Sequence, residues 1–122
     1  MNRTAGTLMR VFISGQISGR KGYMDAFTKA HEWLSLQGYE VIDPAIMTAT
    51  LPKDLPWEAY MEITLPLIKY CDAIYSLCGW EKSTGARIER EYASKLGLEL
   101  MQQDMQELKR MFEGLREYEE GH

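Results

Sequence analysis

Short apolar runs alternate with segments of helical periodicity along this chain, and that alternation restricts its fold more than any other feature. The apolar runs lie, in chain order, at 9–14, 39–42, 73–78 and 98–101. Between them, apolar residues recur at helical spacing over about 23–37, 57–70 and 84–96. Strands that alternate with helices form a layered α/β fold, in which successive strands run parallel because each helix crosses back over the sheet.

The expected fold is therefore a three-layer α/β fold of the flavodoxin or Rossmann type, with a mostly parallel sheet of four to five strands and an additional C-terminal helix. A chain of 122 residues is about the size of one domain. We expect residues 1–122 to form a single domain, in which 1–8 is a loose leader and 102–122 is a helical tail.

Charge and cysteine content exclude several classes of protein. The net charge of −4 argues against binding to a nucleic acid polymer, although a local site for a small anion stays possible. Cys71 and Cys78 fit neither a metal-ligand pattern nor a redox motif, so we expect a reduced, cytoplasmic protein without a metal or an organic cofactor. The sequence contains no run of about 20 apolar residues, so we expect no membrane span.

In parallel sheets, ligands bind beyond the carboxyl ends of the strands. That rule places three connections at one edge: the glycine-containing loop 15–22, the loop that begins at Asp43, and the turn at Gly79. The first loop has neither the ending of a P-loop nor the glycine spacing of a dinucleotide fold, so it is only a weak signal for a phosphate or sugar site. The proline-containing loop 43–56 either has a function or merely separates two elements of secondary structure.

The helix after Gly79 carries a carboxylate on its inward face. Ser83 or Thr84 can cap this helix, and its free N–H groups would attract an anion. At 100° per residue, Glu89 lies within the apolar stripe that faces the protein. An ionised carboxylate is costly to bury, so Glu89 is either satisfied by a structural donor or serves a site.

Three segments of the sequence resemble the nucleoside 2-deoxyribosyltransferase-like superfamily, which includes 2′-deoxynucleoside 5′-monophosphate N-hydrolases. They are Val-Phe-Ile-Ser-Gly in the first strand, Asp-Pro-Ala after the second, and the stretch from Cys71 to Glu89. The resemblance covers about 9–100, and its most specific part is Ser-x-Gly-x-x-x-Glu. In that motif the family's Glu attacks the sugar C1′, which implies that Glu89 is a nucleophile.

The resemblance also implies a set of substrate contacts for a small-molecule nucleoside or nucleotide. Ser83, Thr84 and Gly85 would hold a 5′-phosphate at the helix N-terminus, with Arg20 and Lys21 as secondary candidates for its charge. Tyr23 and Trp80 are candidates for stacking on the base. The remaining expected contacts come from the first loop and from the start of the second, at Gly15, Gln16, Ser18, Gly19 and Asp43.

One position departs from the family pattern. Enzymatic members carry an Asp eight residues before the Asp that opens the third strand, where it assists protonation of the leaving base. Counting back from Asp72 gives Thr64, and the neighbouring Glu62 points outward on the helical wheel. Two interpretations stay open: an enzyme that cleaves or transfers at the N-glycosidic bond, and a non-catalytic nucleotide-binding module that acts as a sensor or sequesters its ligand.

The C-terminal segment carries apolar residues at alternating spacings of four and three, which form a narrow seam. The seam consists of Met101, Met105, Leu108, Phe112 and Leu115. It can pack either on its own sheet or on a second subunit, and we expect a homodimer or higher oligomer.

Overall fold

A computed structural model describes the backbone of residues 8–120 and the side chains of residues 8–113. Most of the expected leader, 1–7, and the last two residues lie outside the described residues. The elements are, in chain order, β1 (Arg10–Ser14), α1 (Tyr23–Leu36), β2 (Glu40–Ile42), α2 (Pro44–Thr48), α3 (Trp57–Thr64), the 3₁₀-helix η1 (Leu65–Tyr70), β3 (Ala73–Ser76), the 3₁₀-helix η2 (Trp80–Lys82), α4 (Thr84–Lys95), β4 (Glu99–Gln102) and α5 (Met105–Glu120).

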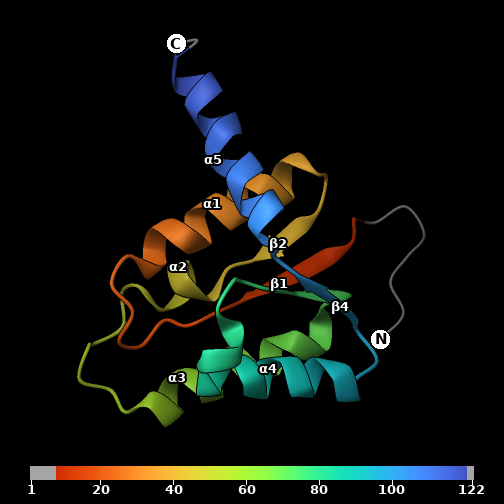
Figure 1. Cartoon of the computed structure of the whole chain (residues 1–122). Coiled ribbons are helices and arrows are strands. Elements are labelled where there is room, and N and C mark those ends of the chain that lie inside the picture. The colour runs from red at the N-terminus through yellow and green to blue at the C-terminus, as the bar shows by residue number, and fades with distance from the viewer. Residues whose placement is uncertain (1–7, 121–122) are drawn as a thin grey trace.

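Within the described residues, the strands form one sheet in the order β2-β1-β3-β4, and every neighbouring pair is parallel. Helices α1, α2 and α5 lie on one face of this sheet, and α3 and α4 lie on the other (Figure 1). The expected three-layer α/β fold with a C-terminal helix is confirmed.

Alternation along the strands builds a separate hydrophobic core on each face. Val11 and Ile13 of β1 point to the α1 side, where they pack with Phe27 and Leu34. Phe12 points to the opposite side and packs with Ile68 and Ala93, beside α4. The central strands β1 and β3 are therefore buried on both faces, whereas the edge strands β2 and β4 are only partly covered.

The loop expected after the second strand contains a short helix instead. Asp43 caps α2 with its side chain, which accepts hydrogen bonds from the backbone N–H groups of Ala45 and Ile46. Pro44 occupies the first helical turn, where its missing N–H costs nothing. The sequence contained both signals, but the helix has only five residues, Pro44–Thr48, which is too short for a periodic pattern to reveal.

The expected helix over 57–70 changes character partway along. It is α-helical to Thr64 and continues as 3₁₀-helix from Leu65. Pro66 has no N–H to continue the α-helical pattern and crowds the preceding turn, and the change to 3₁₀-helix comes one residue before it.

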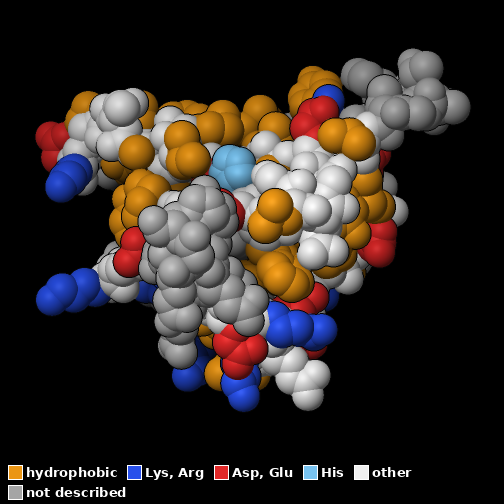
Figure 2. All heavy atoms as spheres, turned by 90° about the horizontal axis from the view of Figure 1, so that it is seen from above, with side chains coloured by type: hydrophobic (Ala, Val, Ile, Leu, Met, Phe, Trp, Pro, Cys, Tyr) orange, Lys and Arg blue, Asp and Glu red, His pale blue; other side chains and the backbone are white. Residues whose placement is uncertain are grey.

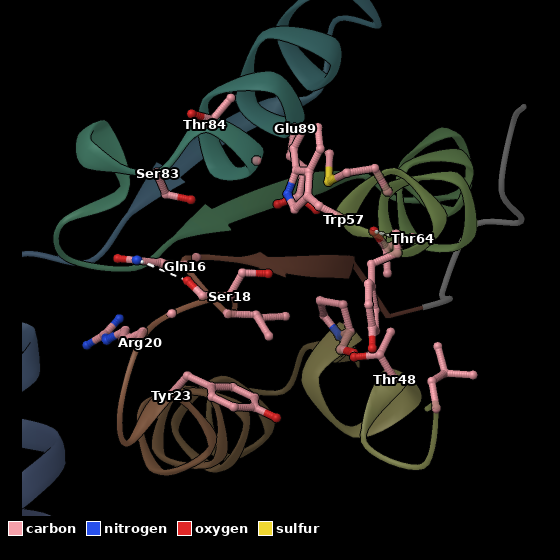
Figure 3. Close-up of a pocket in the computed structure, with 18 of the residues that line it drawn as sticks. Gln16, Ser18, Arg20, Tyr23, Thr48, Trp57, Thr64, Ser83, Thr84 and Glu89 are labelled. Carbon is pink, nitrogen blue, oxygen red and sulfur yellow. Dashed lines mark hydrogen bonds between the residues drawn. The ribbon is translucent and has the colours of Figure 1, made fainter. Parts of the chain in front are cut away.

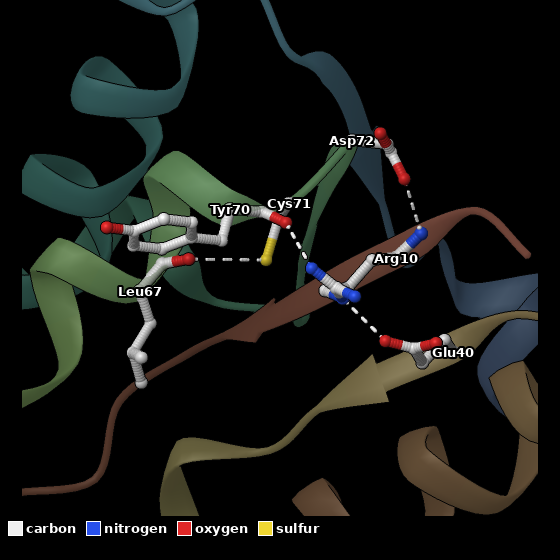
Figure 4. A network of polar contacts seen from close by, with 6 residues as sticks. All are labelled: Arg10, Glu40, Leu67, Tyr70, Cys71 and Asp72. Atoms are coloured by element: carbon white, nitrogen blue, oxygen red, sulfur yellow. Dashed lines mark hydrogen bonds and ion pairs between the residues drawn. The ribbon is translucent and has the colours of Figure 1, made fainter. Parts of the chain in front are cut away.

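The amino edge of the sheet is joined by a polar cluster around Arg10 (Figure 4). Its guanidinium pairs with Glu40 of β2 and donates to the backbone oxygen of Tyr70, while its backbone N–H donates to Asp72. The ion pair with Glu40 raises the pKa of Arg10. The cluster lies at the opposite end of the strands from their carboxyl ends, and therefore belongs to the scaffold.

Helix α5 contacts the rest of the fold through its first turns, and the residue buried there lies outside the expected seam. Met111 is buried in the α1-side core, whereas Met105 is 71% exposed and Phe112 is 47% exposed. Met101 belongs to β4, and the side chain of Leu115 lies outside the described residues. Seen from the side on which α5 projects, hydrophobic side chains cover much of the surface (Figure 2). None of the helices in residues 8–120 combines the length and apolar character needed to cross a bilayer.

Candidate functional site

A cavity of about 1070 Å³ opens at the carboxyl edge of the sheet. Its walls are the β1–α1 loop, α2 with the loop that follows it, α3, and the N-terminal half of α4 (Figure 3). Most of the residues singled out from the sequence line it, namely Gly15, Gln16, Ser18, Gly19, Arg20, Lys21, Tyr23, Ser83, Thr84, Gly85 and Glu89. Asp43 and Trp80 do not line it.

Gly15 allows the first loop to reach the cavity. A Cβ atom at Gly15 would lie 2.8 Å from Cδ1 of Leu77, which follows β3. Because Leu77 is buried in the core, a larger residue at position 15 would push the two strand ends apart. Gly15 therefore allows the start of the β1–α1 loop to pass close to Leu77 at the end of β3.

The turn between β3 and α4 places a helix N-terminus against the cavity. Gly79 adopts a left-handed conformation with φ of 86°, which reverses the chain before η2. Ser83 then caps α4, since its Oγ accepts from the backbone N–H of Ala86 at 3.2 Å. The Ser83–Gly85 segment lines the cavity at this terminus, where backbone N–H groups favour an anion.

Glu89 lies one turn further along α4 and is only 5% exposed. One of its carboxylate oxygens accepts a hydrogen bond from Oγ of Ser14 at 2.6 Å. Burial raises the pKa of Glu89 to about 7, and the bond from Ser14 partly opposes that rise. Glu89 is therefore a carboxyl group at the floor of the cavity whose pKa lies close to neutral pH.

Strand geometry explains why Ser14 meets Glu89. Ser14 follows the same alternation as Phe12, so it points to the α4 face. Its register partner on β3 is Ser76, which points the same way and accepts a hydrogen bond from Arg90 at 2.9 Å. Two paired serines at the strand ends thus hold two successive residues of α4.

Trp80 contributes to this support instead of lining the cavity. The guanidinium of Arg90 lies 4.7 Å from the centre of the Trp80 ring and also donates to the backbone oxygen of Met101 at 3.1 Å. Arg90 therefore joins η2, β3 and β4 behind the site. The sequence did not single out Arg90, because its position on the helix shows only a cationic residue next to Glu89 and not its contacts with the sheet.

Asp43 is buried beneath α2. Besides capping that helix, its second oxygen lies 2.9 Å from Nδ1 of His31 on α1. The capped helix brings Pro44 and Thr48 to the cavity wall. Asp43 thus acts on the site through the position of α2.

The wall supplied by α3 was missed as a binding surface. Trp57, Tyr60 and Met61 line the cavity, and a Cβ at Gly85 would be in van der Waals contact, at 3.5 Å, with the indole nitrogen of Trp57 and with the sulfur of Met61. Trp57 and Tyr60 are three residues apart in α3 and share the face of the helix that is turned to the cavity. Trp57 remains 38% exposed because that side faces the cavity and not the core.

Charge is distributed unevenly around the cavity. Among its described lining residues, Glu89 is the only carboxylate, and four residues carry positive charge: Arg20, Lys21, Lys53 and Lys82. The chain as a whole has a net charge of −4. The described part of the chain contains no group of three or more metal-ligating side chains. The cavity therefore suits a phosphorylated organic molecule.

Comparisons with known proteins agree with this fold. A family model described as "Domain of unknown function (DUF4406)" matches residues 9–102. A 2-deoxyribosyltransferase from the psychrotolerant bacterium Bacillus psychrosaccharolyticus superposes with a TM-score of 0.61 at 17% identity, over 76% of this chain and 70% of that one. A CMP N-glycosidase from Clostridium botulinum superposes with a TM-score of 0.52 at 20% identity, over 76% and 69%.

None of the curated proteins matches the chain by sequence. At 17% and 20% identity, the structural matches establish a shared fold. The resemblance drawn from the sequence is confirmed at that level.

Proposed function

This chain belongs to the family described as "Domain of unknown function (DUF4406)". Because that description gives no activity, we propose one from the residues of the site. The protein cleaves or transfers at the N-glycosidic bond of a nucleoside or deoxynucleoside, or of its 5′-monophosphate. The observation that carries this proposal is the buried Glu89 at the floor of a nucleotide-sized, cation-rimmed cavity. The enzymes that share the fold, a deoxyribosyltransferase and a CMP N-glycosidase, support it.

Glu89 acts as the nucleophile in this proposal. Cleavage of an N-glycosidic bond develops positive charge at C1′, and a carboxylate beneath the sugar stabilises that charge and captures it as a covalent glycosyl intermediate. Ser14 fixes the orientation of the carboxylate and favours its ionised form. Water or a second base then releases the sugar from Glu89.

The phosphate of a 5′-monophosphate binds in this proposal at the N-terminus of α4. Ser83, Thr84 and Gly85 line the cavity there, and Arg20 and Lys21 line it from the first loop. Both features favour a dianion.

The second candidate is a nucleotide-binding module without catalysis, and Thr64 favours it. This residue lines the cavity at the place where the sequence resemblance implies an acid, yet it carries a hydroxyl. A chain that binds nucleotides tightly without turning them over would fit this alternative.

Incubation with nucleosides and 5′-monophosphates, followed by chromatography for free base, tests the proposal. We expect release of base, faster from monophosphates than from nucleosides, and complete loss in Glu89→Ala. Circular dichroism should show that this variant is folded, because Glu89 makes a single side-chain hydrogen bond and belongs to neither core. Undiminished turnover by folded Glu89→Ala would refute the assignment, and binding without turnover by the native chain would favour the module.

A further inference from the structure

The cavity lacks an obvious acid for the departing base. In N-glycoside cleavage a neutral base leaves with the electron pair of the C1′–N bond and must be protonated, so a site for such substrates offers a proton donor to the base. Within the described lining residues there is no histidine, no cysteine and no carboxylate besides Glu89. Any side-chain acid would have to be a cationic group or a hydroxyl, and outside the α2 and α3 walls the lining hydroxyls belong to Ser18, Tyr23, Ser83 and Thr84.

The hydroxyl groups on the α2 and α3 walls are already committed as donors. Oγ1 of Thr64 donates to the backbone oxygen of Tyr60 at 3.1 Å, and the hydroxyl of Tyr60 donates to the backbone oxygen of Pro52 at 2.6 Å. Oγ1 of Thr48 donates to the backbone oxygen of Pro44 at 2.8 Å. A hydroxyl has one proton, so these three groups present only lone pairs to a ligand.

Glu89, in turn, lacks a cation. Among the described residues its side chain is bonded to Ser14 and forms no ion pair. The adjacent Arg90 directs its guanidinium to Ser76 and to the backbone of Met101. A buried carboxylate without a counter-ion gains from any positive charge that a ligand brings beside it.

These two observations point to the same substrate class. We propose that the chain acts on a nucleotide whose base is a pyridinium cation, such as nicotinamide mononucleotide. The inference rests on the proposed function and specifies its leaving group. The α3 wall contributes hydroxyl lone pairs and the aromatic rings of Trp57 and Tyr60, which suit a flat cation, while the cationic lining residues suit its phosphate. Figure 3 shows Trp57 and Thr64 on this wall.

The reaction balances without an acid. A carboxylate oxygen of Glu89 bonds to C1′ as the C1′–N bond breaks, and the electron pair of that bond neutralises the pyridinium nitrogen. Nicotinamide therefore leaves as a neutral molecule and takes up no proton. Water then attacks C1′, the bond to Glu89 breaks, and one proton passes to solvent, so that the products are ribose 5-phosphate, nicotinamide and H⁺.

The test compares initial rates of the full chain on nicotinamide mononucleotide with those on AMP, CMP, dAMP, dCMP, dGMP and TMP, by chromatography of the released base. We expect nicotinamide mononucleotide to be cleaved at least tenfold faster than any nucleotide with a neutral base. Equal or faster cleavage of a neutral-base nucleotide overturns this inference and leaves the proposed function standing. Absence of cleavage throughout the panel overturns both.

Installing an acid on the α3 wall gives a second readout. Thr64→Asp should raise the rate on neutral-base nucleotides relative to nicotinamide mononucleotide by about tenfold or more, whereas the matched Thr64→Asn should not. Thermal unfolding establishes whether each variant is folded. If Thr64→Asp does not fold, the comparison of nucleotides with the native chain remains the deciding test. An unchanged ratio in folded Thr64→Asp would contradict the inference, since protonation would then not limit the neutral bases.

Discussion

Burial of Glu89 lowers the free energy of unfolding by an amount that depends on pH, because the ionised carboxylate is less stable in the folded chain than in water. Its pKa rises from an ordinary value of 4.5 to about 7 because the carboxyl group is buried. Between these values the unfolded chain loses the proton first, so ionisation favours unfolding as pH increases. Each pKa unit corresponds to about 1.4 kcal/mol, so the loss amounts to about 3 kcal/mol between pH 4.5 and pH 7.

Glu89→Gln should remove this pH dependence. We expect the variant to match the native chain near pH 4.5 and to exceed it by about 3 kcal/mol in unfolding free energy at pH 8, measured by urea denaturation. Glu91→Gln is the matched control, because Glu91 is exposed on the same helix and its ion pair among the described residues is with exposed Lys95. Parallel stability curves for the native chain and Glu89→Gln would contradict the raised pKa.

Ser14 positions Glu89, so replacing Ser14 should change how the rate of base release depends on pH. Without the hydrogen bond from Ser14 the pKa of Glu89 rises further, and less of the nucleophile is ionised at pH 7. Ser14→Ala should lose about tenfold in base release at pH 6 to 7 and recover above pH 8, with little change in KM. Ser76→Ala, which removes only the neighbouring bond to Arg90, should keep the native profile.

At the scale of residues, the helical wheel anticipated that Glu89 points inward, because inward direction on a helix follows from spacing alone. It did not reveal Ser14 as the hydrogen-bond partner. That contact joins residues 75 apart in the chain and depends on which face of β1 Ser14 occupies. Trp80 was assigned to the base for the same reason: sequence gives its position near the edge, whereas the contact with Arg90 turns it away.

Helix α4 is fixed to the sheet through Arg90, and this contact should be measurable. Arg90→Met removes two hydrogen bonds and the contact with Trp80, which together should cost about 1 to 3 kcal/mol. We expect a melting temperature lowered by several degrees and faster amide exchange over 79–83.

Arg87→Met provides the control for that change. Arg87 is exposed on the same helix, and its side chain reaches only Thr84. Its replacement should leave melting and exchange nearly unchanged. Equal effects of the two substitutions would mean that Arg90 does not hold the turn.

At the scale of elements, periodicity predicted the strands and the long helices to within a few residues. The signal is clearest in β1, β3, α1 and α4, which carry several buried residues. It failed where an element has no stripe of its own. Helix α2 is five residues long and is held by the side chain of Asp43, and η1 follows from a single proline. Periodicity also left out Met111, which packs into the α1-side core, while Met105 and Phe112 of the expected seam are exposed. Packing of the seam on a second subunit stays a prediction.

At the scale of the whole molecule, we predict association through α5. Met105 and Phe112 are largely exposed and lie with Leu108 around a shallow apolar depression. Covering one such side chain contributes about 1.5 to 3 kcal/mol. Light scattering should give at least twice the monomer mass of 14.1 kDa.

Phe112→Ser should shift this equilibrium toward monomer, whereas Leu36→Ser, at an exposed apolar residue on α1, should not. A monomer at micromolar concentration for the native chain would contradict the prediction.

The central place of β1 in the sheet also determines when the chain can fold during synthesis. β1 pairs with β2 once residue 42 has emerged, but its other edge waits for β3, which begins at Ala73. Until then a nascent chain presents one open, apolar strand edge to its surroundings. During translation of the stretch between the two strands, this open edge of β1 is therefore a place where the nascent chain can pair with other chains.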